Sequence, residues 1–204
     1  MLLGWRCPVC GAQGQVPCVR CVAAMGPADR VPAIPGVDWC AALLSYRGPA
    51  RELVARAKYR NQRAGLRWLA TGMAALVADR SFDAVTWAPA NPAHARRRGF
   101  DHGELLARAV ARELGAPAVA LLRRDRGAPL TGRSAVERYG GPPLRPATSR
   151  AAQGGVLVVD DVITTGATLA TAARTLRSIG ASSVFAVAAA HTPAPTKGPT
   201  RVRV

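Results

Sequence analysis

The sequence has no long run of apolar residues, and this absence excludes one broad class of protein. No apolar run approaches the roughly 18 residues that a membrane-spanning helix needs, so we expect no membrane insertion. Residues 1–6 also lack the charged and apolar regions of a secretory signal peptide. The sequence therefore predicts a soluble, cytoplasmic protein whose thiols stay reduced.

Acidic residues and lysines are scarce as well. The 204 residues include 12 acidic and 28 basic side chains, for a net charge of +16, and only Lys58 and Lys197 are lysines. An excess of arginine attracts polyanions such as nucleic acid, pyrophosphate or an acidic protein. A coding bias toward Ala, Arg, Gly and Pro explains the same composition, and composition alone does not separate the two explanations.

The prediction of the fold depends on the stretch 156–168. The chain is long enough for one hydrophobic core and a small additional module. Four apolar β-formers lead into Asp160 and Asp161, a Thr- and Gly-containing run follows, and apolar residues then recur with helical spacing over 169–179. Gly180 supplies the helix stop. A strand that is apolar at every position is buried on both faces. The sequence thus predicts an α/β fold, a parallel sheet with helices on both faces.

The loop between this strand and helix has the chemistry of a phosphate site. A helix N-terminus exposes unpaired backbone N–H groups, and glycine lets the backbone approach a ligand closely. The residues expected to hold a phosphate monoester are Thr164, Thr165, Gly166, Ala167 and Thr168. Asp160 and Asp161 lie at the carboxyl end of the strand, where carboxylates accept hydrogen bonds from a vicinal diol or approach Mg²⁺.

A phosphate site beside a diol site fits a ribose 5-phosphate. The alternative is a buried strand followed by a Thr-rich helix cap. That alternative leaves an Asp-Asp pair among buried apolar residues without an explanation, because buried charges need partners or ligands.

Further strands and helices are indicated on both sides of this stretch. Apolar runs typical of buried strands occur at 41–46, 82–88, 118–122 and 183–190. We expect 82–88 to be the first strand of the core sheet and 118–122 the second. Helical spacing occurs over 51–77, with a break at 61–65, and over 103–114, where Asp101 or His102 caps the helix. The Arg-, Gly- and Pro-rich segment 123–150 is too long for a plain connection, so we expect a lid or binding loop there.

Two segments before the helix 103–114 carry potential anion contacts. Pro89, Ala90 and Asn91 form a rigid turn at the carboxyl end of the strand 82–88, where backbone N–H groups face the ligand of the Asp160 loop. An arginine run next to an aromatic residue follows, made of Arg96, Arg97, Arg98 and Phe100. Guanidinium groups match phosphate in two-point contacts. Alternatively, the arginines form a solvated run of charge without a ligand. The neighbouring aromatic ring also allows binding of single-stranded nucleic acid, whose bases stack on such rings.

Four of the five cysteines form two Cys-x-x-Cys pairs, Cys7, Cys10, Cys18 and Cys21. Four thiolates in paired knuckles suit tetrahedral Zn²⁺, and a segment this small needs a metal to organise it. Disulfides are disfavoured in a reducing compartment, and a redox Cys-x-x-Cys would not explain the second pair. Cys40 is expected to be a small core residue.

The thirteen residues 156–168 resemble the 5-phosphoribosyl-1-pyrophosphate (PRPP) binding motif of type I phosphoribosyltransferases. The order of paired Cys knuckles, a helical Lys-Tyr-Arg segment at 58–60, an Arg-Gly-Phe turn at 98–100 and this motif resembles the ComF family, bacterial proteins linked to natural competence and DNA uptake. The resemblance implies a type I phosphoribosyltransferase fold with a small N-terminal zinc module of four cysteines.

The resemblance also implies roles for particular residues. Asp160 and Asp161 would hold the ribose hydroxyls and help place Mg²⁺, residues 164–168 would hold the 5-phosphate, and residues 89–91 would form the pyrophosphate loop. The four paired cysteines would bind structural zinc. The implied division is a zinc module at 1–25, a linker at 26–40, a phosphoribosyltransferase-like domain at 41–192 with a lid at about 123–150, and a disordered basic tail at 193–204.

Two positions depart from the ComF pattern: that family usually follows Gly-Phe with Asn-Gln, whereas this chain has Asp101 and His102. The lid region also lacks the Gln and Asn that relatives carry around the arginine at position 138. Three functions remain open. The first is an enzyme that transfers ribose 5-phosphate from PRPP to a nitrogen nucleophile. The second is a non-catalytic single-stranded-DNA-binding protein that works beside a DNA-uptake helicase, and the third is a purine-salvage-type phosphoribosyltransferase.

Overall fold

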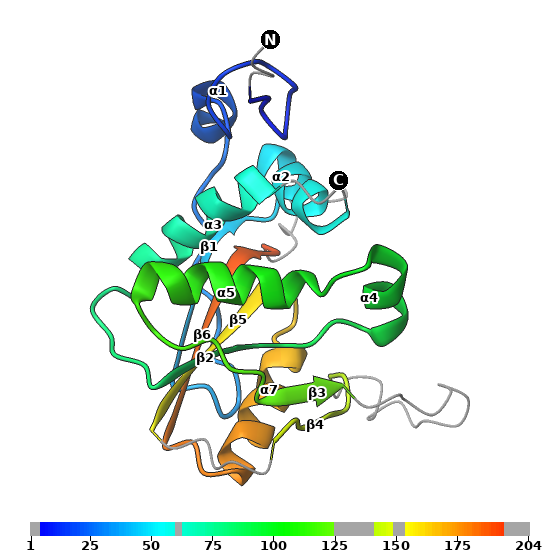
Figure 1. The fold of residues 1–204 in the computed structure, drawn as a ribbon. Coiled ribbons are helices and arrows are strands. Elements are labelled where there is room, and N and C mark those ends of the chain that lie inside the picture. Colours follow the sequence, from blue (N-terminus) through cyan, green and yellow to red (C-terminus); the bar gives the residue numbers. More distant parts are fainter. Residues whose placement is uncertain (1–4, 60–62, 125–140, 149–153, 194–204) are drawn as a thin grey trace, which may run out of the picture.

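The computed structural model describes residues 5–59, 63–124, 141–148 and 154–193. Its helices and strands follow in this order (Figure 1): α1 Val19–Ala23, β1 Trp39–Ser45, α2 Gly48–Tyr59, α3 Arg63–Ala75, β2 Ala84–Trp87, α4 Pro92–Arg98, α5 His102–Leu114, β3 Leu122–Arg124, β4 Leu144–Pro146, β5 Gly155–Ile163, α7 Ala167–Ser178 and β6 Ser183–His191. Within those ranges no helix combines the length and the apolar character needed to cross a membrane.

The four longer strands form one parallel sheet in the order β1-β6-β5-β2. β5 lies inside this sheet, paired with β6 on one side and β2 on the other, and its residues 156–159 are fully buried. A strand with this burial is covered on both faces, which is why it consists of Val and Leu without alternation. The prediction of a parallel sheet from this run is confirmed.

Helices cover both faces of the sheet (Figure 1). On one face α2, α3 and α5 bury Leu53, Leu69 and Leu106 completely against the strands. On the other face α7 buries Leu169 and Leu176, and the antiparallel pair β3–β4 packs beside it. Each of these leucines stabilises the fold by roughly 1.5–3 kcal/mol relative to an exposed side chain. The helices therefore fix the sheet from both sides and leave the ends of its strands accessible.

Local signals place several helix ends where the sequence predicts them. Asp101 is the N-cap of α5, and Gly115 ends that helix in the left-handed conformation with φ 65°. The helical segment at 51–77 is divided into α2 and α3, although residues 60–62 lie outside the described residues. The strand predicted at 183–190 is β6.

Other predictions about the sheet were wrong. The first strand of the core sheet is β1, which pairs with β6 through Trp39 and Phe185, and not the segment 82–88. The run 118–122 contributes only a single bridge from Ala118 to Val85, and β3, which begins at Leu122, pairs with β4. The helix α4 was not expected, because it has no apolar periodicity. Of the predicted lid, residues 125–140 and 149–150 lie outside the described residues, as does the tail beyond residue 193.

The N-terminal residues are packed on the domain. Pro27 forms a bridge with Leu44 at the end of β1, and Val31 and Ile34 are buried in the apolar cluster under α7. Val9, which lies between Cys7 and Cys10, and Met25, which follows the second cysteine pair, pack against the cluster on the opposite face of the sheet. The segment predicted as a linker thus follows the edge of the sheet closely.

Candidate functional site

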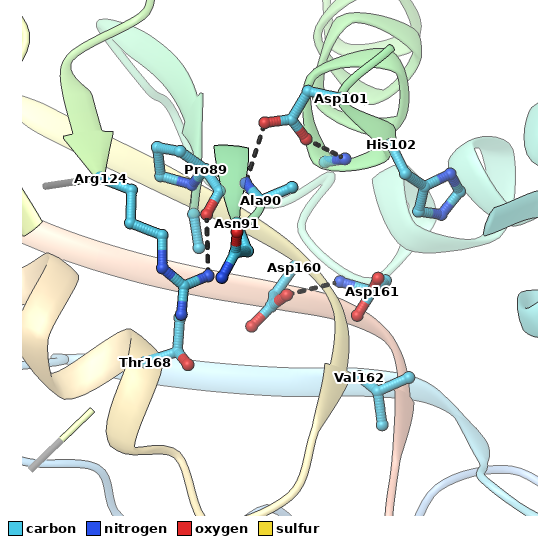
Figure 2. A pocket seen from close by; sticks show the side chains of 12 residues that line it. Pro89, Ala90, Asn91, Asp101, His102, Arg124, Asp160, Asp161, Val162 and Thr168 are labelled. Carbon is cyan, nitrogen blue, oxygen red and sulfur yellow. Dashed lines mark hydrogen bonds between the residues drawn. The ribbon is translucent and has the colours of Figure 1, made fainter. Parts of the chain in front are cut away.

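A cavity of about 310 Å³ opens where the parallel strands β2 and β5 end. Its lining comes from four separate parts of the chain (Figure 2), namely Ala88, Pro89, Ala90, Asn91, Asp101, His102, Gly103, Arg124, Asp160, Asp161, Val162 and Thr168. Both acids of the motif, the Pro-Ala-Asn turn and Thr168 therefore lie around one space. This is the edge of a parallel sheet at which ligands of α/β folds bind.

The two acids lie in the last part of β5, and both are half-buried. The Asp161 backbone N–H donates to Asp160 Oδ1 at 2.8 Å, which fixes the direction of the Asp160 carboxylate. Both acids line the cavity (Figure 2). Partly hydrated carboxylates offer the hard oxygen ligands that Mg²⁺ prefers, so this pair fits a magnesium ion.

Asp101 connects the turn at 89–91 to the start of α5. Its Oδ1 accepts from the backbone N–H of Gly103 at 2.8 Å and, at 3.4 Å, from that of Glu104, as an N-cap does. Its Oδ2 accepts from the backbone N–H of Ala90 at 2.9 Å (Figure 2). The acid that replaces an amide of the ComF pattern thus has a structural function. It also occupies one of the amides that we expected to face a ligand.

His102 is the first residue of α5, is 2% exposed and lines the cavity. Its imidazole stands at the second position where the sequence departs from the ComF pattern. Asn91 accepts from the Ala93 N–H at 2.9 Å and so caps α4. The turn at 89–91 is therefore held at its middle residue by Asp101 and at its last residue by the cap of α4.

The predicted phosphate loop connects β5 to α7, but its residues differ in position. Thr168 lines the cavity, Thr164 and Thr165 are exposed, and Ala167 is the first residue of α7. The Ala167 N–H donates to Thr165 Oγ1 at 3.4 Å. The 12-residue helix α7 begins at the same end of the sheet as the acids, and the N–H groups of a first helical turn have no partner within their own helix.

The fold itself requires glycine at position 166, and the close approach to a ligand that the sequence suggested stays a prediction. Its φ is 75°, in the left-handed region, and a Cβ at this position would lie 2.9 Å from Cγ1 of Ile34. Both the backbone conformation and the packing of Ile34 therefore require glycine. Ile34 belongs to the segment predicted as a linker, which in this way shapes the loop.

The described side chains of the arginine run lie outside the cavity lining. Arg96 and Arg97 are exposed near the end of α4, Arg98 is its last residue, and Phe100 is half-buried between α4 and α5. Gly99 ends α4 with φ 77°. Among the described side chains of this run, neither those of Arg96 and Arg97 nor that of Phe100 line the cavity. Arg96 and Arg97 therefore form an exposed basic pair outside the cavity.

Sequence reasoning missed Arg124, the last residue of β3. It lines the cavity, and its Nη1 donates to the backbone oxygen of Pro89 at 3.5 Å (Figure 2). Burial lowers the pKa of Arg124, and the charges of Asp160 and Asp101 oppose this shift. Arg124 lies in an arginine-rich segment without periodicity, so no sequence signal distinguished it from its neighbours.

The four paired cysteines form one cluster, in which all four Sγ atoms lie within 4.8 Å of one another and Cys10 Sγ and Cys18 Sγ are 3.6 Å apart. Tetrahedral ligands at the Zn–S distance of about 2.3 Å stand about 3.8 Å apart, so the cluster fits zinc. Burial opposes ionisation of Cys7, but backbone hydrogen bonds, the first from the Cys18 N–H, outweigh it and lower the pKa to about 6. Burial, followed by the neighbouring cysteines, raises the pKa of Cys21 to about 12.

The family model described as phosphoribosyl transferase domain matches residues 101–202, which is half of the chain. The sequence matches none of the curated proteins with which it was compared.

Three solved structures illustrate the structural likeness. UMP synthase of Leishmania donovani is 20% identical with a TM-score of 0.40, over 68% of this chain and 23% of that one. The glutamine PRPP amidotransferase of B. subtilis is 21% identical with a TM-score of 0.45, over 67% and 30%. Orotate phosphoribosyltransferase of Aeropyrum pernix is 23% identical with a TM-score of 0.39, over 68% and 62%. This chain spans less than a third of the length of the first two.

Proposed function

Because this chain belongs to the phosphoribosyl transferase domain family, we propose that its cavity binds PRPP together with Mg²⁺ and that the protein transfers the ribose 5-phosphate group. One observation carries the proposal. The cavity brings the two acids of β5, Thr168 at the start of α7 and the turn at 89–91 around a single space at the end of the sheet. Acids for a diol and amides for a phosphate are the two halves that a phosphorylated ribose needs.

The proposed roles follow the positions of the residues. The N–H groups and hydroxyls of residues 164–168 hold the 5-phosphate, and Asp160 and Asp161 accept from the ribose hydroxyls and hold Mg²⁺. The pyrophosphate lies toward the turn at 89–91. When bound, Mg²⁺ supplies positive charge that favours departure of pyrophosphate. A nitrogen nucleophile bonds to C1 of the ribose as the bond to pyrophosphate breaks, so the protein needs no nucleophile of its own.

Pyrophosphate release from PRPP, measured with a panel of nitrogen bases, tests this function. Wild-type protein should release pyrophosphate with at least one base, and Asp160→Asn with Asp161→Asn should reduce the rate by about 100-fold or more. Thr192→Ser is a matched control, since Thr192 follows β6 and does not line the cavity. An undiminished rate in the double variant would contradict the proposed site.

The finer proposal is a ComF-like protein that acts in DNA uptake and competence or in nucleotide metabolism. The cysteine cluster supports it, because it fits a zinc ion at the N-terminus, ahead of the phosphoribosyltransferase region. We propose a zinc module at 1–25, a linker at 26–40, whose last two residues already belong to β1, and a phosphoribosyltransferase-like domain at 41–192. The lid at about 123–150 and the basic tail at 193–204 fall largely outside the described residues. Reduced thiols in the cluster are consistent with a cytoplasmic location.

A second candidate is a non-catalytic protein that binds single-stranded DNA beside a helicase. The net charge of +16 and the exposed Arg96 and Arg97 favour it. Binding of single-stranded DNA that weakens steeply with salt, together with no turnover of PRPP by the wild type, would favour this function over the enzyme. Turnover confined to a purine base would favour the purine-salvage alternative.

A further inference from the structure

The walls of the cavity carry an unbalanced set of charges. Asp101, Asp160 and Asp161 supply three carboxylates, and among the described residues that line the cavity Arg124 is the only arginine or lysine. A ligand that carries several phosphates is repelled by such a wall unless positive charge is brought close to it. Within the described lining, Arg124 is therefore the side chain that offers a fixed positive charge to an anionic ligand.

Arg124 is held in position by its strand and by the turn. β3 pairs Arg124 with Leu144 of β4, which is buried under α7. The guanidinium donates to the backbone oxygen of Pro89, which belongs to the predicted pyrophosphate turn. Figure 2 shows the guanidinium on the side of the cavity where this turn and Thr168 lie, facing Asp160. The side chain thus reaches the place where the two phosphate-binding segments meet.

The guanidinium has two competing electrostatic partners. Asp160 and Asp101 favour its charged form, although the half-buried side chain is partly desolvated. Arginine stays protonated in proteins, so its charge partly neutralises the two carboxylates in the ligand-free cavity. The same planar group is suited to two-point binding of phosphate.

We propose that Arg124 exchanges partners when a ligand enters: it neutralises Asp160 in the ligand-free protein and binds the diphosphate of PRPP in the complex. This inference rests on the proposed function. It has a consequence that a purely structural arginine would not have. Removing the charge should weaken binding of a diphosphate but strengthen binding of a divalent cation alone, because the Arg124 charge then no longer offsets the charge of Asp160.

The test is equilibrium binding to the full chain by calorimetry, with four probes: PRPP with Mg²⁺, pyrophosphate with Mg²⁺, ribose 5-phosphate with Mg²⁺, and Mn²⁺ alone. Arg124→Met should bind PRPP and pyrophosphate about 10- to 100-fold more weakly, as expected for loss of a charge-assisted hydrogen bond. Ribose 5-phosphate binding should change by less than about threefold, since that ligand lacks the diphosphate. Mn²⁺ should bind about threefold more tightly or better.

Two further variants separate the charge from the fold. Arg124→Lys keeps the positive charge without the planar fork and should give intermediate affinities. It also carries the test if Arg124→Met does not fold. Arg123→Ala is the matched control, because the neighbouring Arg123 is exposed and its Nε donates to the backbone oxygen of Pro146 at 3.2 Å. All four affinities should match the wild type in this control.

The outcomes distinguish the inference from the proposed function. If the wild type binds PRPP and the Arg124 variants bind it equally well, the partner exchange is wrong while the proposed function stands. Equal losses for PRPP and ribose 5-phosphate, or weaker binding of Mn²⁺ in Arg124→Met, would also overturn it. If the wild type binds none of the three sugar or phosphate ligands, the proposed function and the inference are both wrong.

Discussion

The cysteine cluster and the cavity are built from the chain in opposite ways. The four cysteines lie within fifteen consecutive residues, 7–21, and their sulfur atoms converge through local turns. The cavity draws on residues from 88 to 168, and its charges come from β3, β5 and the start of α5. A local site can be recognised from spacing, whereas a distributed site depends on the sheet that brings its parts together. The two regions should therefore respond differently to single substitutions.

The largest expected effect is at the cysteine cluster. Cys7→Ser removes one ligand of four, and a structural zinc site contributes about 10–16 kcal/mol of apparent binding free energy, so we expect loss of bound zinc and a large fall in melting temperature. Zinc content measured by atomic emission, with thermal unfolding followed by circular dichroism, checks this. Cys40→Ala is the control and should retain the metal.

Retention of stoichiometric zinc by Cys7→Ser would contradict the four-ligand site. PRPP binding by the folded fraction of Cys7→Ser then tests whether the two regions are independent. We expect this fraction to bind PRPP, since no residue of the cluster lines the cavity.

A smaller effect is expected at the connection between the turn and α5. Asp101→Ala removes the N-cap and the acceptor of the Ala90 N–H, and should lower the free energy of unfolding by about 2 kcal/mol. Asp101→Asn keeps an acceptor at the cap and should lose less than about 1 kcal/mol. Urea unfolding measures both. Equal stabilities of Asp101→Ala and the wild type would mean that the turn is held by other contacts.

The smallest effect concerns Cys40, whose thiol is half-buried. Burial, and then the charge of Asp160, raise its pKa from 9.0 to about 12. Between pH 9 and pH 11 the unfolded chain releases this proton while the folded chain retains it, so the wild type loses stability as pH rises. By pH 10 the loss should be on the order of 1 kcal/mol relative to Cys40→Ala, whose curve lacks this contribution. Urea unfolding of both proteins at pH 8, 9 and 10 measures the difference, and parallel curves would contradict the shifted pKa.

The sequence was most informative where the pattern was continuous. Val156 to Val159 predicted a strand buried on both faces, and Asp101 with Gly115 bounded α5. Prediction from the sequence was wrong where pairing between distant segments decides whether a segment forms a strand. Ala118 makes only one bridge to Val85, and α4 follows from the cap at Asn91, with no apolar stripe to signal it.

The candidate site shows the same division. The motif residues Asp160, Asp161 and Thr168 were placed around one cavity, as their order in the chain suggested. Arg124 was missed because its position depends on the pairing of β3 with β4. The reason for Gly166 was missed because Ile34, which fills the space beside it, is 132 positions earlier in the chain. Local spacing indicates chemistry, but only the folded sheet shows which distant side chains complete it.

The most direct test of the central claim is a crystal structure of the protein with PRPP and Mg²⁺. The account predicts the 5-phosphate against residues 164–168, the ribose hydroxyls at Asp160 and Asp161, and the diphosphate between the turn at 89–91 and Arg124. A ligand bound elsewhere on the protein, with this cavity empty at saturating PRPP, would contradict it.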